Sequence, residues 1–114
     1  MATDASTLYK LIILYMLDRV NSPMTNAQIS EFVLEKGYTT YFTLQEVLNT
    51  LISDGFITEE SYHSSTHYTI TDSGRETINF FKYKISSSIV SDINLFLSDN
   101  KYELKEAVNN ISEY

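Results

Sequence analysis

Two helical patterns separated by a very short connector constrain this chain more than any other feature. The first pattern covers about residues 26–36 and begins at Thr25, which can form an S/T-x-x-E/Q capping box with Gln28. Gly37 is a typical C-terminal stop for this helix. After three further residues a second pattern covers about residues 41–54. Two amphipathic helices joined by so few residues predict a helix-turn-helix.

The flanking segments extend this unit to a winged helix. An apolar helix is expected at about residues 7–20, and β-branched and aromatic residues predict a wing hairpin at about 56–71. The stretch from Thr71 to Gly74 then introduces further helices. The expected fold class is mainly α with a small β-hairpin, a winged helix-turn-helix followed by C-terminal helices. We expect the winged helix at residues 1–74 and a C-terminal helical segment at 75–114.

Composition and motifs argue against several classes of protein. The 114 residues include no cysteine, which fits a reducing compartment and removes thiol nucleophiles. The longest apolar run, residues 11–17, is far below the roughly 20 residues that span a membrane, so we expect a cytoplasmic protein. No phosphate loop, nucleophile elbow or zincin motif is present. We expect no enzyme activity, cofactor or metal, because His63 and His67 lack a third ligand at a fixed spacing.

Three stretches of the sequence resemble an uncharacterised bacterial family, a domain of unknown function with an N-terminal winged helix. They are residues 10–18, 25–30 and 38–45, and the resemblance covers about residues 8 to 114. The stretch from Tyr68 to Gly74 is similar to the wing-to-helix junction of PadR-like and MarR-like transcription regulators. Members of the uncharacterised family usually continue into a further C-terminal region, so we expect a short or truncated member. The resemblance implies a transcription regulator with a winged helix.

The charge distribution conflicts with ordinary DNA binding. The formal net charge is −7, and residues 1–74 hold three basic residues against nine acidic ones. DNA-binding domains usually use lysine and arginine to neutralise phosphates. The acidity is therefore concentrated in the part of the chain that is expected to contact DNA.

The candidate DNA-binding residues follow from the helix-turn-helix, whose second helix enters the major groove. On that helix Gln45 and Asn49 can bond adenine, and threonines can contact a thymine methyl group. The pattern lacks a cation, and the alternative is that its threonines are caps and its amides face solvent. The wing could contact phosphates or be a plain polar hairpin. The candidates are Thr39, Thr40, Tyr41, Thr43, Gln45, Asn49, His63, Ser65 and Arg75.

An excess of apolar residues predicts a homodimer. The first helix is apolar on several sides, and a spacing of three or four residues forms a seam in the C-terminal segment. The alternative is that the C-terminal helix folds back on its own domain. A last short helix is expected around Val108. The candidate dimerisation residues are Leu11, Leu14, Tyr15, Ile85, Ile89, Ile93 and Phe96.

Two functions follow from these patterns. The first, favoured by the fold and the resemblance, is a dimeric transcriptional regulator that binds double-stranded DNA. The second is a winged-helix protein–protein interaction module that does not bind DNA. A negative surface over the second helix of the pair and the wing favours the second function.

Overall fold

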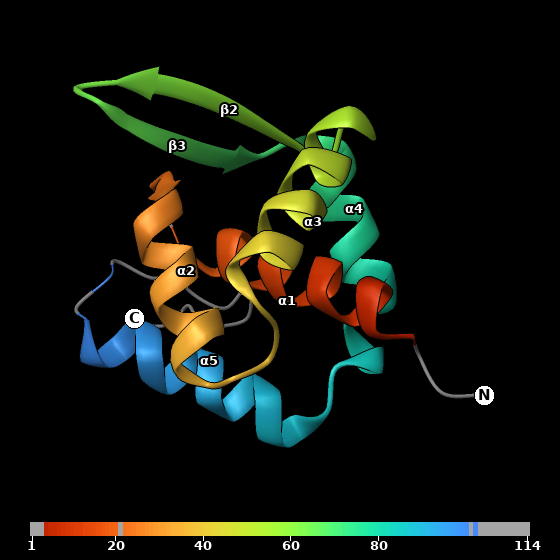
Figure 1. Ribbon diagram of the computed structural model, residues 1–114. Helices are drawn as coiled ribbons and strands as arrows, with labels where there is room; N and C mark the ends of the chain where they lie inside the picture. Colours follow the sequence, from red (N-terminus) through yellow and green to blue (C-terminus); the bar gives the residue numbers. More distant parts are fainter. Residues whose placement is uncertain (1–3, 21, 101, 103–114) are drawn as a thin grey trace, which may run out of the picture.

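The computed structural model describes residues 4–20, 22–100 and 102, and it has the predicted order of elements (Figure 1). The expected class, mainly α with a small β-hairpin in a winged-helix arrangement, is confirmed. The observed helix bounds lie within two residues of the expected ones. The elements are α1 (Ala5–Arg19), β1 (Met24–Thr25), α2 (Asn26–Glu35), α3 (Tyr41–Ser53), β2 (Ile57–Tyr62), β3 (Ser65–Ile70), α4 (Asp72–Phe81), the 3₁₀ turn η1 (Lys82–Lys84) and α5 (Ser87–Asp99).

The sheet has one strand more than the sequence predicts. Its order is β1-β3-β2 and both pairs are antiparallel. In β1, Met24 pairs with Tyr68 and Thr25 pairs with His67. A strand of two residues directly after Pro23 carries no alternation that a sequence could reveal. This short strand joins the N-terminus of α2 to the hairpin.

Side-chain caps and left-handed glycines set the helix ends, as the sequence indicates. The Thr25–Gln28 capping box is present, with Thr25 N donating to Gln28 Oε1 at 2.8 Å. Gly37 and Gly55 have φ of 72° and 83° and follow the last turns of α2 and α3. Thr71 caps α4, its Oγ1 accepting from Gly74 N at 3.1 Å. Local chemistry therefore fixes the lengths of the helices that carry the site.

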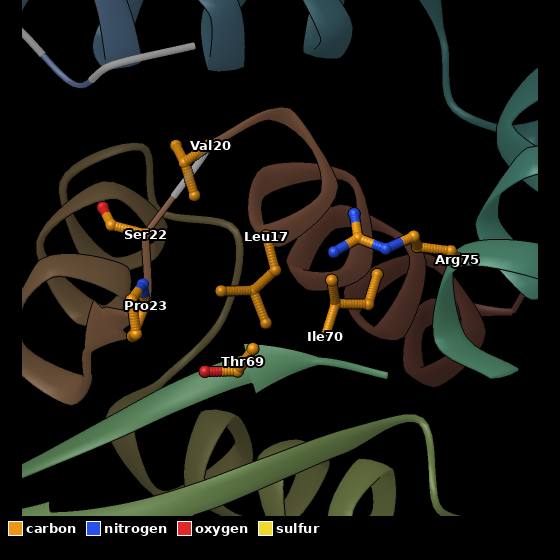
Figure 2. A pocket seen from close by; sticks show the side chains of 7 residues that line it. All are labelled: Leu17, Val20, Ser22, Pro23, Thr69, Ile70 and Arg75. Carbon is orange, nitrogen blue, oxygen red and sulfur yellow. The ribbon is translucent and has the colours of Figure 1, made fainter. Parts of the chain in front are cut away.

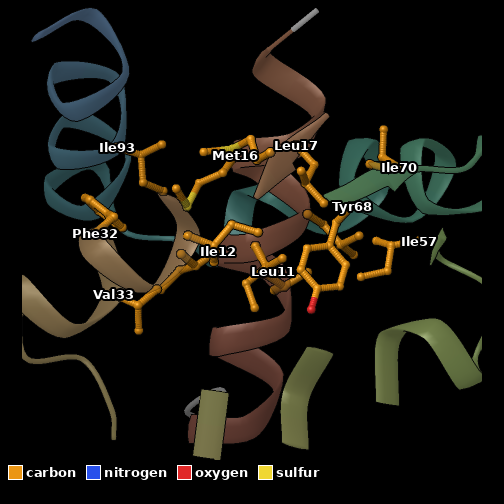
Figure 3. Close-up of a cluster of buried hydrophobic side chains, with 14 of the residues drawn as sticks. Leu11, Ile12, Met16, Leu17, Phe32, Val33, Ile57, Tyr68, Ile70 and Ile93 are labelled. Atoms are coloured by element: carbon orange, nitrogen blue, oxygen red, sulfur yellow. The ribbon is translucent and has the colours of Figure 1, made fainter. Parts of the chain in front are cut away.

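Helix α1 is apolar on several sides because it is buried from two directions within one chain (Figure 3). Ile93 of α5 and Phe32 of α2 lie on one side of it. On the other side lie sheet residues that include Tyr68. Helix α5 crosses the end of the molecule away from the hairpin (Figure 1). This arrangement leaves the hairpin, α3 and the start of α2 free to form a surface.

The predicted dimerisation seam is corrected by this packing. Its members Leu11, Leu14, Ile85, Ile93 and Phe96 are each at most 8% exposed within a single chain. Tyr15 and Ile89 are partly buried against the same cluster. The apolar residues of α5 pack against the core of their own chain. This packing agrees with the alternative in which the C-terminal helix folds back on its own domain. Residues 103–114, including the helix expected around Val108, lie outside the described residues.

Candidate functional site

An open cleft of about 600 Å³ lies between the N-terminal part of α2, helix α3 and the hairpin. Figure 1 shows the hairpin lying over the start of α2 and beside α3. The cleft is lined by Thr25, Asn26, Ala27, Ser30, Tyr41, Gln45, Asn49, Glu59, Ser64, Ser65, Thr66 and Tyr68. We call it the α3–wing cleft. Its lining joins three segments that are far apart in the sequence.

A hydrogen-bond network centred on Asn26 forms part of this lining. Asn26 Nδ2 donates to Gln45 Oε1 at 2.8 Å and to Tyr68 Oη at 3.0 Å. Asn26 Oδ1 accepts from Ser30 Oγ at 3.1 Å and from Gln45 Nε2 at 3.3 Å. The network ties α2 to α3 and to β3. It connects the walls of the cleft to one another.

Glu59 is the one acidic residue among the described residues that line the cleft. Burial raises the pKa of Tyr68, the hydrogen bond from Asn26 opposes that rise, and the charge of Glu59 adds to it. Glu59 pairs with Tyr68 across β2 and β3, so the two side chains lie on the same face. No lysine or arginine is among the described residues that line the cleft. The site therefore favours a positively charged group.

The first turn of α3 is held by its own threonines. Thr40 is the N-cap, and its Oγ1 accepts from Thr43 N and donates to Thr43 Oγ1, both at 3.2 Å. This geometry matches the cap alternative for Thr40 and Thr43. Thr39 is partly buried in the connector. These three residues do not line the cleft.

Other predicted residues of α3 do line the cleft. Tyr41 is 56% exposed, and Asn49 is exposed one turn beyond Gln45. Gln45, a predicted base reader, is instead engaged at both ends of its amide by Asn26. Its part in the site is to position the neighbouring walls. Tyr41 and Asn49 remain available to a ligand.

The hairpin turn contributes hydroxyl groups to the cleft. His63 and Ser64 occupy the turn with φ of 54° and 63°, the geometry of a type I′ hairpin turn. Ser65, a candidate DNA contact from sequence, lines the cleft together with Ser64 and Thr66. His63 does not line the cleft. Its ring packs edge-on against the ring of Tyr62, with 5.5 Å between the ring centroids. The wing thus presents serine and threonine hydroxyl groups to the cleft, with Glu59 beside them.

Arg75, the predicted phosphate contact, lies elsewhere. Its Nη1 donates to Asp18 Oδ1 of α1 at 3.3 Å. Figure 2 shows it with Leu17 and Ile70 around a separate hollow of about 110 Å³. Although Arg75 follows the wing closely in sequence, helix α4 directs it toward α1. It is not part of the α3–wing cleft.

Of the twelve residues that line the cleft, only Tyr41, Gln45, Asn49 and Ser65 were among the candidates from sequence, and Glu59 was not. Asn26, Ser30 and Tyr68 supply most of the network described above. A usable signal was present on α2, because Asn26 and Ser30 are polar and four apart, and so share one face. Tyr68 had no such signal, since an aromatic residue in a strand is ordinary. Its role depends on the register of β3 against β1 and β2.

Two searches of the described residues give further findings. No group of three or more histidine and acidic side chains is arranged to hold a metal ion in that part of the chain. Among the helices described, none combines the length and the apolar character needed to cross a membrane.

Comparison with known proteins places the chain in a family. No curated protein and no solved structure matches it. The model of a domain of unknown function, DUF4364, matches residues 9–114, which confirms the expected membership of an uncharacterised family. That match carries no likeness to PadR-like or MarR-like regulators. The chain belongs to the DUF4364 family.

Proposed function

We propose that this protein is a winged-helix interaction module whose α3–wing cleft binds a positively charged segment of a partner protein. The observation that carries this proposal is the charge of the cleft. Glu59 is the one acidic residue among the described residues that line it, and no lysine or arginine is among them. The Glu59 carboxylate repels a phosphate and attracts an ammonium or guanidinium group.

The lining offers suitable partners for a lysine or arginine side chain. The Glu59 carboxylate can accept charge-assisted hydrogen bonds. The Asn49 amide oxygen and the hydroxyl groups of Ser65 and Thr66 can accept further bonds. The ring of Tyr41 is 56% exposed and can receive a cation on its face. Together these groups recognise a cation on an extended peptide.

The acidic residues of the cleft and its surroundings disfavour nonspecific binding to DNA. Affinity for the duplex depends on the number of phosphates that lysine and arginine neutralise, and this number sets the slope against salt. No lysine or arginine is among the described residues that line the α3–wing cleft. Glu46 of α3 and Glu60 of β2 are exposed acidic residues on two of the elements that form it. Any duplex would have to be held by base contacts against this repulsion.

The test is a selection of bound peptides from a random display library, followed by titration of a selected peptide. We expect basic peptides, and weaker binding as salt rises. Glu59→Gln should weaken binding about tenfold, because it removes the carboxylate that bonds the cation. Glu60→Gln is the matched control: it has the same charge change on the same strand, but its side chain points to the opposite face. Selection of neutral peptides, or equal effects of the two variants, would refute the proposal.

A DNA-binding transcriptional regulator is the second candidate. It is favoured by the arrangement of Tyr41, Asn49 and the hairpin hydroxyl groups, which open on one cleft. A two-fold dimer would present two such clefts to half-sites about one helical turn apart. Selection from random duplex DNA at two salt concentrations tests it. An enriched sequence whose binding is lost in Asn49→Ala, together with a dimer by light scattering, would support this candidate.

A further inference from the structure

A second cavity, of about 280 Å³, lies among α1, the end of α3, α4 and η1. Its apolar walls are formed by Leu11 and Leu14 of α1, Leu51 of α3, Phe56, and Phe81 of α4. Thr7 and Thr77 add two hydroxyl groups. We call it the α1–α4 cavity. Its elements differ from those of the α3–wing cleft, except that both use α3.

The charge of this cavity is the reverse of the charge of the cleft. Lys10 and Lys84 line it, and no acidic residue does so among the described residues. Hydrogen bonds from Thr7 lower the pKa of Asp4, and Lys10 lowers it further, so Asp4 lies near this lysine. Asp4 is exposed, and such a pair in water is weak. The described lining of this cavity therefore carries two positive charges in a chain whose net charge is −7.

The volume and the shape of the lining limit the class of ligand. Ligand pockets are usually mostly apolar, with a few polar groups that fix the orientation of the ligand, and their volumes begin at about 300 Å³. A cavity of about 280 Å³ holds roughly nine water volumes of about 30 Å³ each, so it fits a ligand of about ten non-hydrogen atoms. The two lysines can bind one negatively charged group of the ligand, and the leucine and phenylalanine side chains can pack against its apolar part.

We propose that the α1–α4 cavity binds a small amphipathic monoanion, with its apolar part against Leu11, Leu51 and Phe81 and its carboxylate between Lys10 and Lys84. Lys84 has a competing contact, since its Nζ lies 5.6 Å from the centroid of the exposed Tyr83 ring. That contact is solvated and contributes little against a carboxylate. The site goes beyond the proposed function and does not depend on it.

The experiment is a titration of the full chain with octanoate, followed by amide chemical shifts. Octanoate has about ten non-hydrogen atoms, the size that the cavity fits. We expect saturable shifts on α1, α4 and the end of α3. The neutral isostere 1-octanol should bind about tenfold more weakly, because it cannot accept charge-assisted bonds from the lysines.

Three variants locate the site. Lys10→Gln combined with Lys84→Gln should weaken octanoate about tenfold and leave 1-octanol unchanged. Thr77→Phe should weaken both ligands, because the added ring occupies the cavity. Lys36→Gln combined with Lys82→Gln makes the same change in net charge at lysines that do not line the cavity, and it should have little effect. Absence of saturable binding at millimolar octanoate, equal affinity for the alcohol, or equal effects of the two lysine pairs would overturn the proposal.

Discussion

Asn26→Ala tests whether the network in the α3–wing cleft holds the fold together. Asn26 takes part in four hydrogen bonds, with Gln45, Tyr68 and Ser30. Tyr68 and Ser30 are 4% and 8% exposed, so water replaces the lost partner poorly. At about 0.5 kcal/mol for each bond, the low end for a partly buried site, the loss is about 2 kcal/mol. The higher helix propensity of alanine returns at most about 0.5 kcal/mol.

Urea unfolding followed by circular dichroism measures this loss. We expect a lower midpoint at an unchanged m-value, and a Tm lower by about 10 °C. Asn49→Ala is the control, because Asn49 is exposed on α3 and its loss should change the stability by less than about 0.5 kcal/mol. Combining Asn26→Ala with Gln45→Ala should cost about 1 kcal/mol less than the sum of the single changes. Equal stabilities of the Asn26 and Asn49 variants would refute the reasoning.

Three further predictions concern the hairpin and the first turn of α4. Gly74→Ala should destabilise the fold by about 2 kcal/mol, because an added Cβ would overlap the Phe56 carbonyl oxygen; an unchanged unfolding midpoint would contradict this. Ser64→Gly should stabilise it by about 0.5 kcal/mol, since Ser64 has φ of 63°, and a lower Tm would argue against strain there. Glu59→Gln should move the raised pKa of Tyr68 back toward its ordinary value, as followed by NMR of labelled tyrosine rings. Because the folded-state pKa of Tyr68 is raised, its contribution to stability is present below about pH 10 and is lost as the pH rises further.

The bounds of α2 and α3 could be predicted because their ends have local chemical signals. Thr25 and Gln28 close the capping box within four residues, and Gly37 and Gly55 occupy the left-handed positions that end α2 and α3. Such signals need only neighbouring residues. The strand Met24–Thr25 has no such signal as a strand, because its backbone hydrogen bonds depend on pairing with the distant β3.

The partners of buried surfaces could not be predicted in the same way. An apolar spacing such as Ile85, Ile89 and Ile93 shows that a face is buried, but not whether the covering surface comes from the same chain. Arg75 illustrates the same limit for charges. Its nearness to the wing in sequence suggests a shared surface, yet one helical turn directs it to Asp18.

The candidate site contains residues that local patterns predict and residues that only the fold brings together. Tyr41 and Asn49 were predicted because the helix-turn-helix places them on the exposed side of α3. The Asn26–Gln45–Tyr68 contacts join residues 19 and 42 positions apart, and these separations are set by the fold alone. The charge count was informative without any structure. It indicated an excess of acidic residues in the winged helix, and Glu59 is the one acidic residue among the described residues that line the cleft, with no lysine or arginine.

Helix α3 borders both proposed sites, so their ligands should influence each other. Tyr41 and Asn49 line the cleft, and Leu51 of the same helix lines the α1–α4 cavity. Tyr41 and Leu51 are ten residues apart, or about 15 Å along a helix that moves as one body. A ligand between α1 and α3 should push α3 toward the hairpin and narrow the cleft. We therefore expect saturating octanoate to weaken the selected basic peptide about fivefold.

Linkage supplies an internal check on this last prediction, because the peptide must weaken octanoate by the same factor. Calorimetric titration of each ligand, with and without the other, measures both factors. The chain with Lys10→Gln and Lys84→Gln should need about tenfold more octanoate for the same effect on the peptide, since its cavity binds the anion about tenfold more weakly. If the unmodified chain binds the peptide equally in both conditions, α3 does not move between the two states, and the sites work independently.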